Sequence, residues 1–239
     1  MSNPVDTLLE SFLREADTAG VGGFAVVLYG SAVRGNWIAG HSDVNLMLVL
    51  DYLTPDTLRG LGPAFKILSA GKQQPPLVMS MSEWSCSADA FPIEISDMKD
   101  AYRVLRGSDP LLGLRVKPAD LRRALEREFR GKLMRLRQAY VVAAGKPAEL
   151  GKFAGQSVSS IVLLLRAVLT LKGEKPPRDP VSLISTAAEL VGFKSANLLR
   201  VYEHRADSAW KCTNEEYEAY LEVAEVATRF VDQFQTGEK

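Results

Sequence analysis

Hydrophobic positions follow two different patterns along the chain, and the change between them falls near residue 110. In the first part, short apolar runs that end at turn residues alternate with segments whose apolar residues recur at helical spacing. The runs predict strands at 24–29, 44–50, 77–81 and 91–95. The helical spacing predicts helices at 4–19, 55–70 and 98–105. This part is therefore expected to be α+β with about four strands.

From Asp120 onward the strand pattern is absent and only helical spacing remains. The predicted helices are 121–144, 157–171, 181–191, 195–206 and 214–234. Segment 157–171 is apolar nearly all round, which is typical of the central helix of a bundle. Gly and Pro are frequent at 107–118, so the boundary is placed there. The expected architecture is a small mixed-sheet α+β domain at 1–112 followed by an all-α helical bundle at 113–239.

Composition and charge narrow the possible partners. The 239 residues contain 29 Lys plus Arg and 29 Asp plus Glu, so the formal net charge is zero and a globally basic nucleic-acid surface is excluded. No uninterrupted apolar run reaches the roughly 18–20 residues that span a bilayer, so no membrane partner is expected. The N-terminal dozen residues contain acids and no basic start, which is unlike a secretory signal. Only Cys86 and Cys212 occur, without metal-binding spacing, and a reducing, cytoplasmic compartment is expected.

Candidate chemistry is concentrated between the first two predicted strands, in residues 25–50. The first strand ends at Gly30, where backbone can approach a ligand closely, and the amides that follow open a short helix, which favours phosphate. The second strand begins with Asp43 and Asn45, which project to one side because residues two apart on a strand share a face. Oxygen ligands beside a phosphate-binding turn suit Mg²⁺-assisted phosphoryl or nucleotidyl transfer.

The sequence GSAVRG followed by SDVNLMLVL resembles the nucleotidyltransferase superfamily, which includes polymerase-β-like enzymes and antibiotic nucleotidyltransferases. The family pattern is an apolar strand, Gly-Ser, a short helix, Asp-x-Asp opening the next strand, and a third carboxylate on a later strand. Gly30, Ser31 and Asp43 match the first elements at the usual spacing. Glu94, in the sequence FPIEI, is the candidate for the third carboxylate. The resemblance covers roughly residues 20–110.

This resemblance implies an enzyme that moves a nucleoside monophosphate from a nucleoside triphosphate, ATP by expectation, to an acceptor hydroxyl with Mg²⁺ or Mn²⁺. The implied nucleotide-binding residues are Gly30, Ser31 and Arg34. The implied catalytic and metal-binding residues are Asp43, Asn45 and Glu94. Each has an ordinary structural alternative: a turn cap for Asp43, a sheet-edge position for Asn45, a solvent-facing position for Glu94, and a salt bridge for Arg34.

The chain departs from the family pattern at Asn45, where the second aspartate of the pair is expected. A neutral amide oxygen is a weaker ligand for a hard cation than a carboxylate, so the two-metal mechanism is weakened. The alternative function is therefore a catalytically degenerate nucleotidyltransferase-fold protein that binds a nucleotide or a protein partner as a regulator. The sequence leaves the acceptor, the nucleotide preference and the oligomeric state open.

A basic arc lies on the predicted helix 121–144. It consists of Arg123, Arg127, Arg130 and Arg137, which fall on one side of the helix at about 100° per residue. One interpretation is a solvated flank of a bundle helix. The other is a surface that grips triphosphate or a nucleic-acid backbone. Nucleic acid is therefore a possible but not a favoured partner.

Overall fold

The computed structural model describes residues 4–35, 37 and 43–235. It divides into two compact units: unit 1 comprises Met1–Ala90 and Met98–Arg115, and unit 2 comprises Phe91–Asp97 and Val116–Lys239. Unit 1 contains a mixed four-stranded sheet with helices, and unit 2 is helical. The predicted fold class, an α+β domain followed by a helical bundle, is confirmed.

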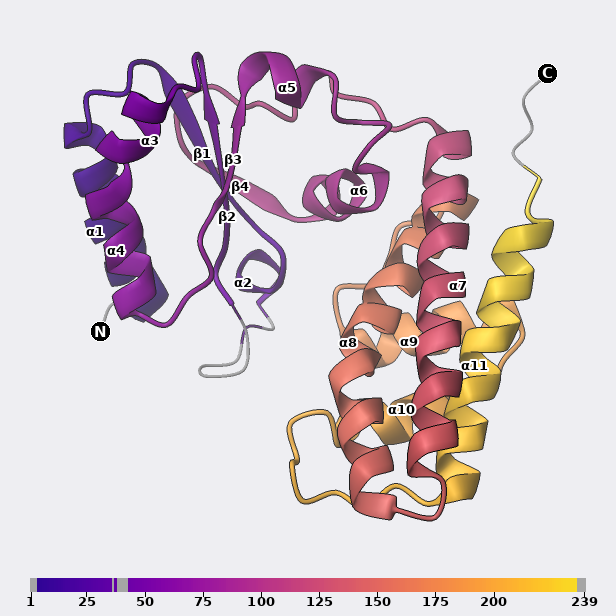
Figure 1. The fold of residues 1–239 in the computed structure, drawn as a ribbon. Helices are drawn as coiled ribbons and strands as arrows, with labels where there is room; N and C mark the ends of the chain where they lie inside the picture. The colour runs from indigo at the N-terminus through magenta and orange to yellow at the C-terminus, as the bar shows by residue number, and fades with distance from the viewer. Residues whose placement is uncertain (1–3, 36, 38–42, 236–239) are drawn as a thin grey trace. The chain divides into compact units, whose positions relative to one another are not determined.

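Unit 1 is built on a sheet with the strand order β3-β2-β1-β4 (Figure 1). Strand β1 is antiparallel to both β2 and β4, and β2 is parallel to β3. The elements are α1 (Pro4–Thr18), β1 (Phe24–Tyr29), α2 (Ser31–Arg34), β2 (Asn45–Leu50), α3 (Pro55–Gly60), α4 (Gly62–Ala70), β3 (Leu77–Ser80), α5 (Met81–Ser85) and β4 (Tyr102–Arg106). Helix α6 (Pro92–Asp100) crosses from unit 2 into unit 1.

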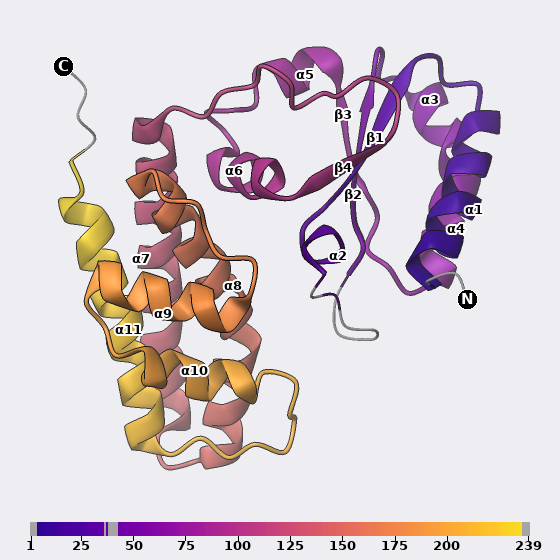
Figure 2. The same cartoon turned by 180° about the vertical axis from the view of Figure 1, so that it is seen from behind.

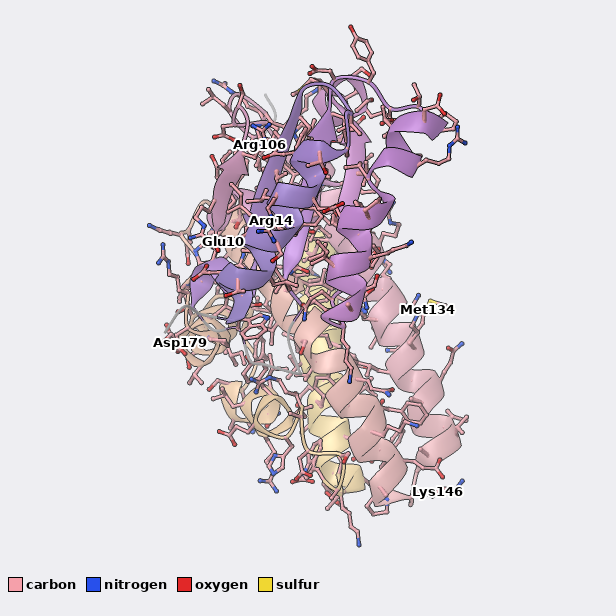
Figure 3. The ribbon with its side chains drawn as sticks, turned by 90° about the vertical axis from the view of Figure 1, so that its left-hand side faces the viewer. Glu10, Arg14, Arg106, Met134, Lys146 and Asp179 are labelled. Atoms are coloured by element: carbon pink, nitrogen blue, oxygen red, sulfur yellow. The ribbon has the colours of Figure 1, made fainter. Side chains whose placement is uncertain are left out.

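One face of the sheet is closed by α1 and α4. Side chains of alternate residues on β1 and β2, such as Leu28 and Leu48, form one apolar core with those helices. Helices α1 and α4 lie side by side in both views of the ribbon (Figures 1 and 2). Helix α1 buries Phe12 against this core, while Glu10 and Arg14 lie on its outer surface (Figure 3). The amphipathic spacing that predicted α1 is the pattern that seats it on the sheet.

The elements predicted at 91–105 are wrong. Residues 91–95 do not form a strand but begin helix α6, and the predicted helix 98–105 gives way to strand β4. The short Ile93-Glu94-Ile95 alternation fits either periodicity, because three residues cannot separate a period of 2 from one of 3.6. Pro92 favours the helix, because a proline in the first turn presets the backbone dihedral and lacks only an N–H that would have no intrahelical partner.

The described part of unit 2 contains five further helices, which match the predicted ones with shifted ends. They are α7 (Pro118–Ala143), α8 (Pro147–Lys172), α9 (Pro180–Val191), α10 (Ser195–Glu203) and α11 (Asn214–Gln233). Helices α9 and α10 lie across the long helices (Figure 2). The single apolar core of unit 2 includes side chains from all five.

Helix α8 is the central helix of this core, as its apolar sequence predicted. It is longer than the predicted segment 157–171. No apolar segment long enough to span a bilayer is expected from the sequence, but helix α8 has the length and composition of a membrane span. However, 61% of its most apolar window is buried inside unit 2, which is the pattern of a core helix. Gly151 lets α8 approach the loop before α11, because a Cβ at that position would overlap the carbonyl oxygen of Trp210.

Candidate functional site

The turn after β1 depends on the glycine at position 30. Gly30 has φ 79° and ψ −145°, a region that only glycine adopts without strain. A Cβ on Gly30 would also lie 2.8 Å from the side-chain nitrogen of Asn45. The Gly30 N–H donates to the carbonyl oxygen of Ala101 (3.2 Å), which ties the turn to the start of β4. Ser31 then opens α2, where the N–H groups of Val33 and Arg34 donate to the carbonyl oxygen of Gly30 (3.1 Å each) and those of Ser31 and Ala32 have no acceptor within the helix.

The start of β2 places Asp43 and Asn45 on the same side of the chain. Val44 between them is 2% exposed and belongs to the core under α1 and α4. Its N–H donates to the side-chain oxygen of Gln73 (2.7 Å), which fixes this residue. Because side chains alternate along an extended chain, Asp43 and Asn45 project away from that core. Asp43 is exposed and Asn45 is half-buried.

Sheet register identifies the other residues on this side. Tyr29 pairs with Asn45 on β2 and with Tyr102 on β4, while Leu77 of β3 pairs with Met47. Paired residues point to the same face, so these five residues define what we call the site face. The four described strands contain no acidic residue on either face.

The hydroxyl of Tyr102 donates to the carboxylate of Asp109 (2.8 Å). This hydrogen bond raises the pKa of Tyr102 above its ordinary value, with burial and the charge of Asp109 adding to the effect. Tyr102 is therefore a neutral side chain at physiological pH. It adds aromatic surface to the site face without adding charge.

Arg34 forms an ion pair with Asp100, the last residue of α6. The Arg34 Nε and Asp100 Oδ2 atoms are 3.3 Å apart, and the side chains are only 7% and 11% exposed. Sequence reasoning missed Asp100, because the segment around it was assigned to a helix that continued into β4. The salt-bridge alternative for Arg34 is therefore observed, and its phosphate-binding role stays a prediction.

Glu94 lies at an exposed position of α6, in the part of this helix that belongs to unit 2. The strand that was expected to present it beside Asp43 does not exist, so its ligand role stays a prediction without that support. Within the described part of the chain, no three Asp, Glu, His or Cys side chains come together as a metal site.

The basic arc on α7 is paired with carboxylates of unit 2. The pairs are Arg123 with Asp120, Arg127 with Glu128 (3.7 Å), Arg130 with Glu126 (3.1 Å) and Asp232 (2.8 Å), and Arg137 with Glu225 (2.8 Å). Two of these arginines connect α7 to α11. The pairing supports the interpretation of the arc as the flank of a bundle helix.

A cavity of about 360 Å³ lies on the other side of the sheet from Asn45. Leu28 and Arg103, which pair with each other across β1 and β4, line it together with Val5, Val33 and Trp37. Leu28 faces the core under α1, so this cavity is separate from the site face. Its lining includes none of the six site residues predicted from the sequence.

Comparison with known proteins supports the fold. No family model and no curated protein match the chain. Among solved structures, the crystal structure of spectinomycin adenyltransferase AAD(9) from Enterococcus faecialis with ATP and spectinomycin is similar, with a TM-score of 0.59. The match covers 95% of this chain and 99% of that chain at 12% sequence identity. The chain has the nucleotidyltransferase fold.

The nucleotidyltransferase fold agrees with the resemblance seen in residues 25–50. At 12% identity the similarity establishes the fold alone. The site face carries the predicted Asn45 together with Tyr29 and Tyr102, whereas Glu94, the predicted third carboxylate, lies on helix α6 and not on a strand.

Proposed function

We propose that the protein binds a nucleoside triphosphate, ATP in the first instance, on the site face of unit 1. The observation that supports this most directly is the pairing of Tyr29 with Asn45, which sets the Gly30 turn beside Asn45. A backbone turn open to close approach and two oxygen-bearing side chains then adjoin one another. The structurally similar adenyltransferase was crystallised with ATP, which makes ATP the first ligand to test.

The residues present are suited to one cation that arrives with the nucleotide. Mg²⁺ is usually held by one or two protein oxygens together with substrate phosphates and water. Asp43 and Asn45 would supply the protein oxygens, and the ion would offset the repulsion between the phosphates and Asp43. The amides after Gly30 and the predicted phosphate ligand Arg34 would contact the phosphates.

Nucleotidyl transfer to a hydroxyl-bearing small molecule is the second candidate. It is favoured by the extent of the structural match, because 95% of the chain aligns with an adenyltransferase, helical region included. In that reaction an acceptor oxygen bonds to the α-phosphorus, and the bond to the bridging oxygen breaks. Pyrophosphate leaves with the electron pair, and the hydroxyl proton passes to a base, for which Glu94 is the predicted residue, or to water.

Calorimetric titration with ATP tests the binding proposal. We expect ATP to bind the wild-type protein in the presence of Mg²⁺ and to lose most of its affinity for Asp43→Ala. Asp51→Ala is the matched control, because Asp51 is also an exposed aspartate but lies at the opposite end of β2. Equal affinity for all three proteins would place the nucleotide elsewhere, and an absence of binding to folded wild type would reject the proposal.

Pyrophosphate release tests the second candidate. Wild type and Asn45→Asp would be incubated with ATP, Mg²⁺ and spectinomycin or related polyhydroxylated acceptors. A steep rise in release by Asn45→Asp would identify Asn45 as the cause of low activity. Turnover by wild type that the substitution leaves unchanged would show instead that Asn45 is an accepted variant ligand.

A further inference from the structure

The site face provides fewer negative charges than a two-cation centre requires. Two-metal transfer sites hold their ions roughly 3.5–4 Å apart, so that both the attacking and the leaving oxygen are stabilised. Two divalent ions at that distance repel strongly unless carboxylates lie between and around them. In the family pattern that this chain resembles, a carboxylate would stand at the position of Asn45, whose amide is neutral. Asp43 is left as the carboxylate at the start of β2.

The strands that flank Asn45 do not replace the missing charge. On one side its partner is Tyr29 of β1. On the other side, Leu77 is the first residue of β3 and pairs with Met47, two residues along from Asn45. Leu77 is on the site face and 47% exposed. Adjacent strands lie about 4.8 Å apart and two residues span about 6.6 Å along a strand, so the Cα atoms of Asn45 and Leu77 are expected roughly 8 Å apart, within reach of a long side chain. A glutamate could stand at this position, but the chain has a leucine.

Two acids of unit 1 near the site face do not fill the gap either. Asp109 accepts hydrogen bonds from the Tyr102 hydroxyl (2.8 Å) and from the Leu111 N–H (2.9 Å), so both of its carboxylate oxygens are engaged. Asp100 is near the Gly30 turn through Ala101, but it is buried against Arg34. An arginine partner offsets the negative charge that a second cation would need. Glu94 lies on helix α6 and not on a strand of the sheet. This agrees with the absence of a three-ligand metal cluster among the described residues.

We propose that the site binds one divalent cation together with its nucleotide, lacks the second cation position, and leaves the bond between the α- and β-phosphates intact. This inference rests on the proposed function, because it presupposes nucleotide binding on the site face. The protein then holds its nucleotide and releases it unchanged.

Counting bound Mn²⁺ by electron paramagnetic resonance tests the proposal without relying on activity. The protein is held in excess over α,β-methylene-ATP, which cannot undergo transfer, and the nucleotide alone serves as the blank. We expect one bound Mn²⁺ per nucleotide for wild type and two for Asn45→Asp combined with Leu77→Glu. The matched control combines Asn45→Asp with Leu77→Gln, which has the shape of glutamate without its charge and is expected to bind one.

The outcomes separate this inference from the proposed function. Two Mn²⁺ per nucleotide in wild type would overturn the inference, and a return to one in Glu94→Gln would identify the unrecognised ligand. Release of pyrophosphate from ATP by wild type would overturn it as well. No binding of the analogue to folded wild type would instead overturn the proposed function. The wild-type count does not depend on whether the variants fold, and circular dichroism melting curves show whether they do.

Discussion

Substituting Gly30 by alanine is expected to weaken nucleotide binding strongly while costing little more stability than a matched substitution nearby. Gly35 provides the match, because it ends the same short helix α2 and also has a positive φ, 83° against 79° for Gly30. The two positions differ in their surroundings. A Cβ on Gly30 would lie 2.8 Å from the Asn45 side-chain nitrogen, whereas a Cβ on Gly35 meets no described atom within 4 Å.

The expected losses of stability follow from the backbone strain at each position and from the contact that the new Cβ would make. Backbone strain in the region that Gly30 adopts costs on the order of 1–3 kcal/mol for alanine. The left-handed conformation of Gly35 costs about 1–2 kcal/mol. The contact with Asn45 adds little to the first value, because the atom that must move is the end of a half-buried side chain. Both variants should therefore lose similar stability, but in Gly30→Ala the Asn45 amide is turned away from the ligand.

Urea unfolding and ATP calorimetry on both variants test this reasoning. We expect ATP affinity to fall at least about tenfold, or 1.4 kcal/mol, in Gly30→Ala and to stay near wild type in Gly35→Ala. Combining Gly30→Ala with Asn45→Ala completes a double-mutant cycle, and non-additive effects on binding would show that the two residues act together. Equal ATP affinity in the two glycine variants, at equal stability, would refute the role of the Gly30–Asn45 contact.

Three further predictions concern the rest of the molecule. Gly151→Ala should lower the free energy of unfolding by about 1–3 kcal/mol, because its Cβ would overlap backbone. A Cβ added at Gly131 on α7 has no described atom within 4 Å, so Gly131→Ala should raise the free energy of unfolding by about 0.4–1 kcal/mol. Urea unfolding curves that rank the two variants the other way would contradict the close packing at Gly151. Asp179 is the N-cap of α9 and accepts hydrogen bonds from the backbone N–H and the hydroxyl of Ser182. These hydrogen bonds lower the pKa of Asp179 below its ordinary 3.8. Its contribution to stability should therefore be present above pH 3.8 and be lost as the pH falls further, whereas Asp179→Asn should lose less over the same range in acid unfolding. Burial raises the pKa of the Cys212 thiol to about 12, so near pH 8 a thiol reagent should label exposed Cys86 and spare Cys212 until the protein unfolds; equal labelling rates would show that unit 2 opens readily.

Local patterns were sufficient for most of the fold. The helices of unit 2 could be predicted because their apolar spacing extends over enough residues to show the helical period. Strand β1 could be predicted because it is a short, β-branched apolar run that ends at a glycine. The segment 91–105 failed because its apolar residues are few and closely spaced. Ile95 and Met98 are buried three residues apart, as on one side of a helix, while Tyr102–Arg106 alternates as a strand.

The site could be predicted only where it depends on neighbours in sequence. Gly30, Asp43 and Asn45 follow from a turn and a strand start, and the structure places them at adjacent ends of β1 and β2. The pair of Arg34 with Asp100 joins residues 66 apart in the chain, and no local pattern connects them. The position of Leu77 on the site face likewise follows only from the register of β3 against β2.

If the proposed nucleotide binding holds, charge rather than shape would decide whether the site keeps or transfers its nucleotide. Aspartate and asparagine have nearly the same volume, so a carboxylate would fit beside Gly30 where the amide of Asn45 now lies. Leu77 is exposed, so a glutamate there would not disturb the core. The backbone that would position both carboxylates is already in register. The combined Asn45→Asp and Leu77→Glu variant should therefore change the number of bound cations with little change in stability, and a large loss of stability would show that the site face is constrained by packing instead.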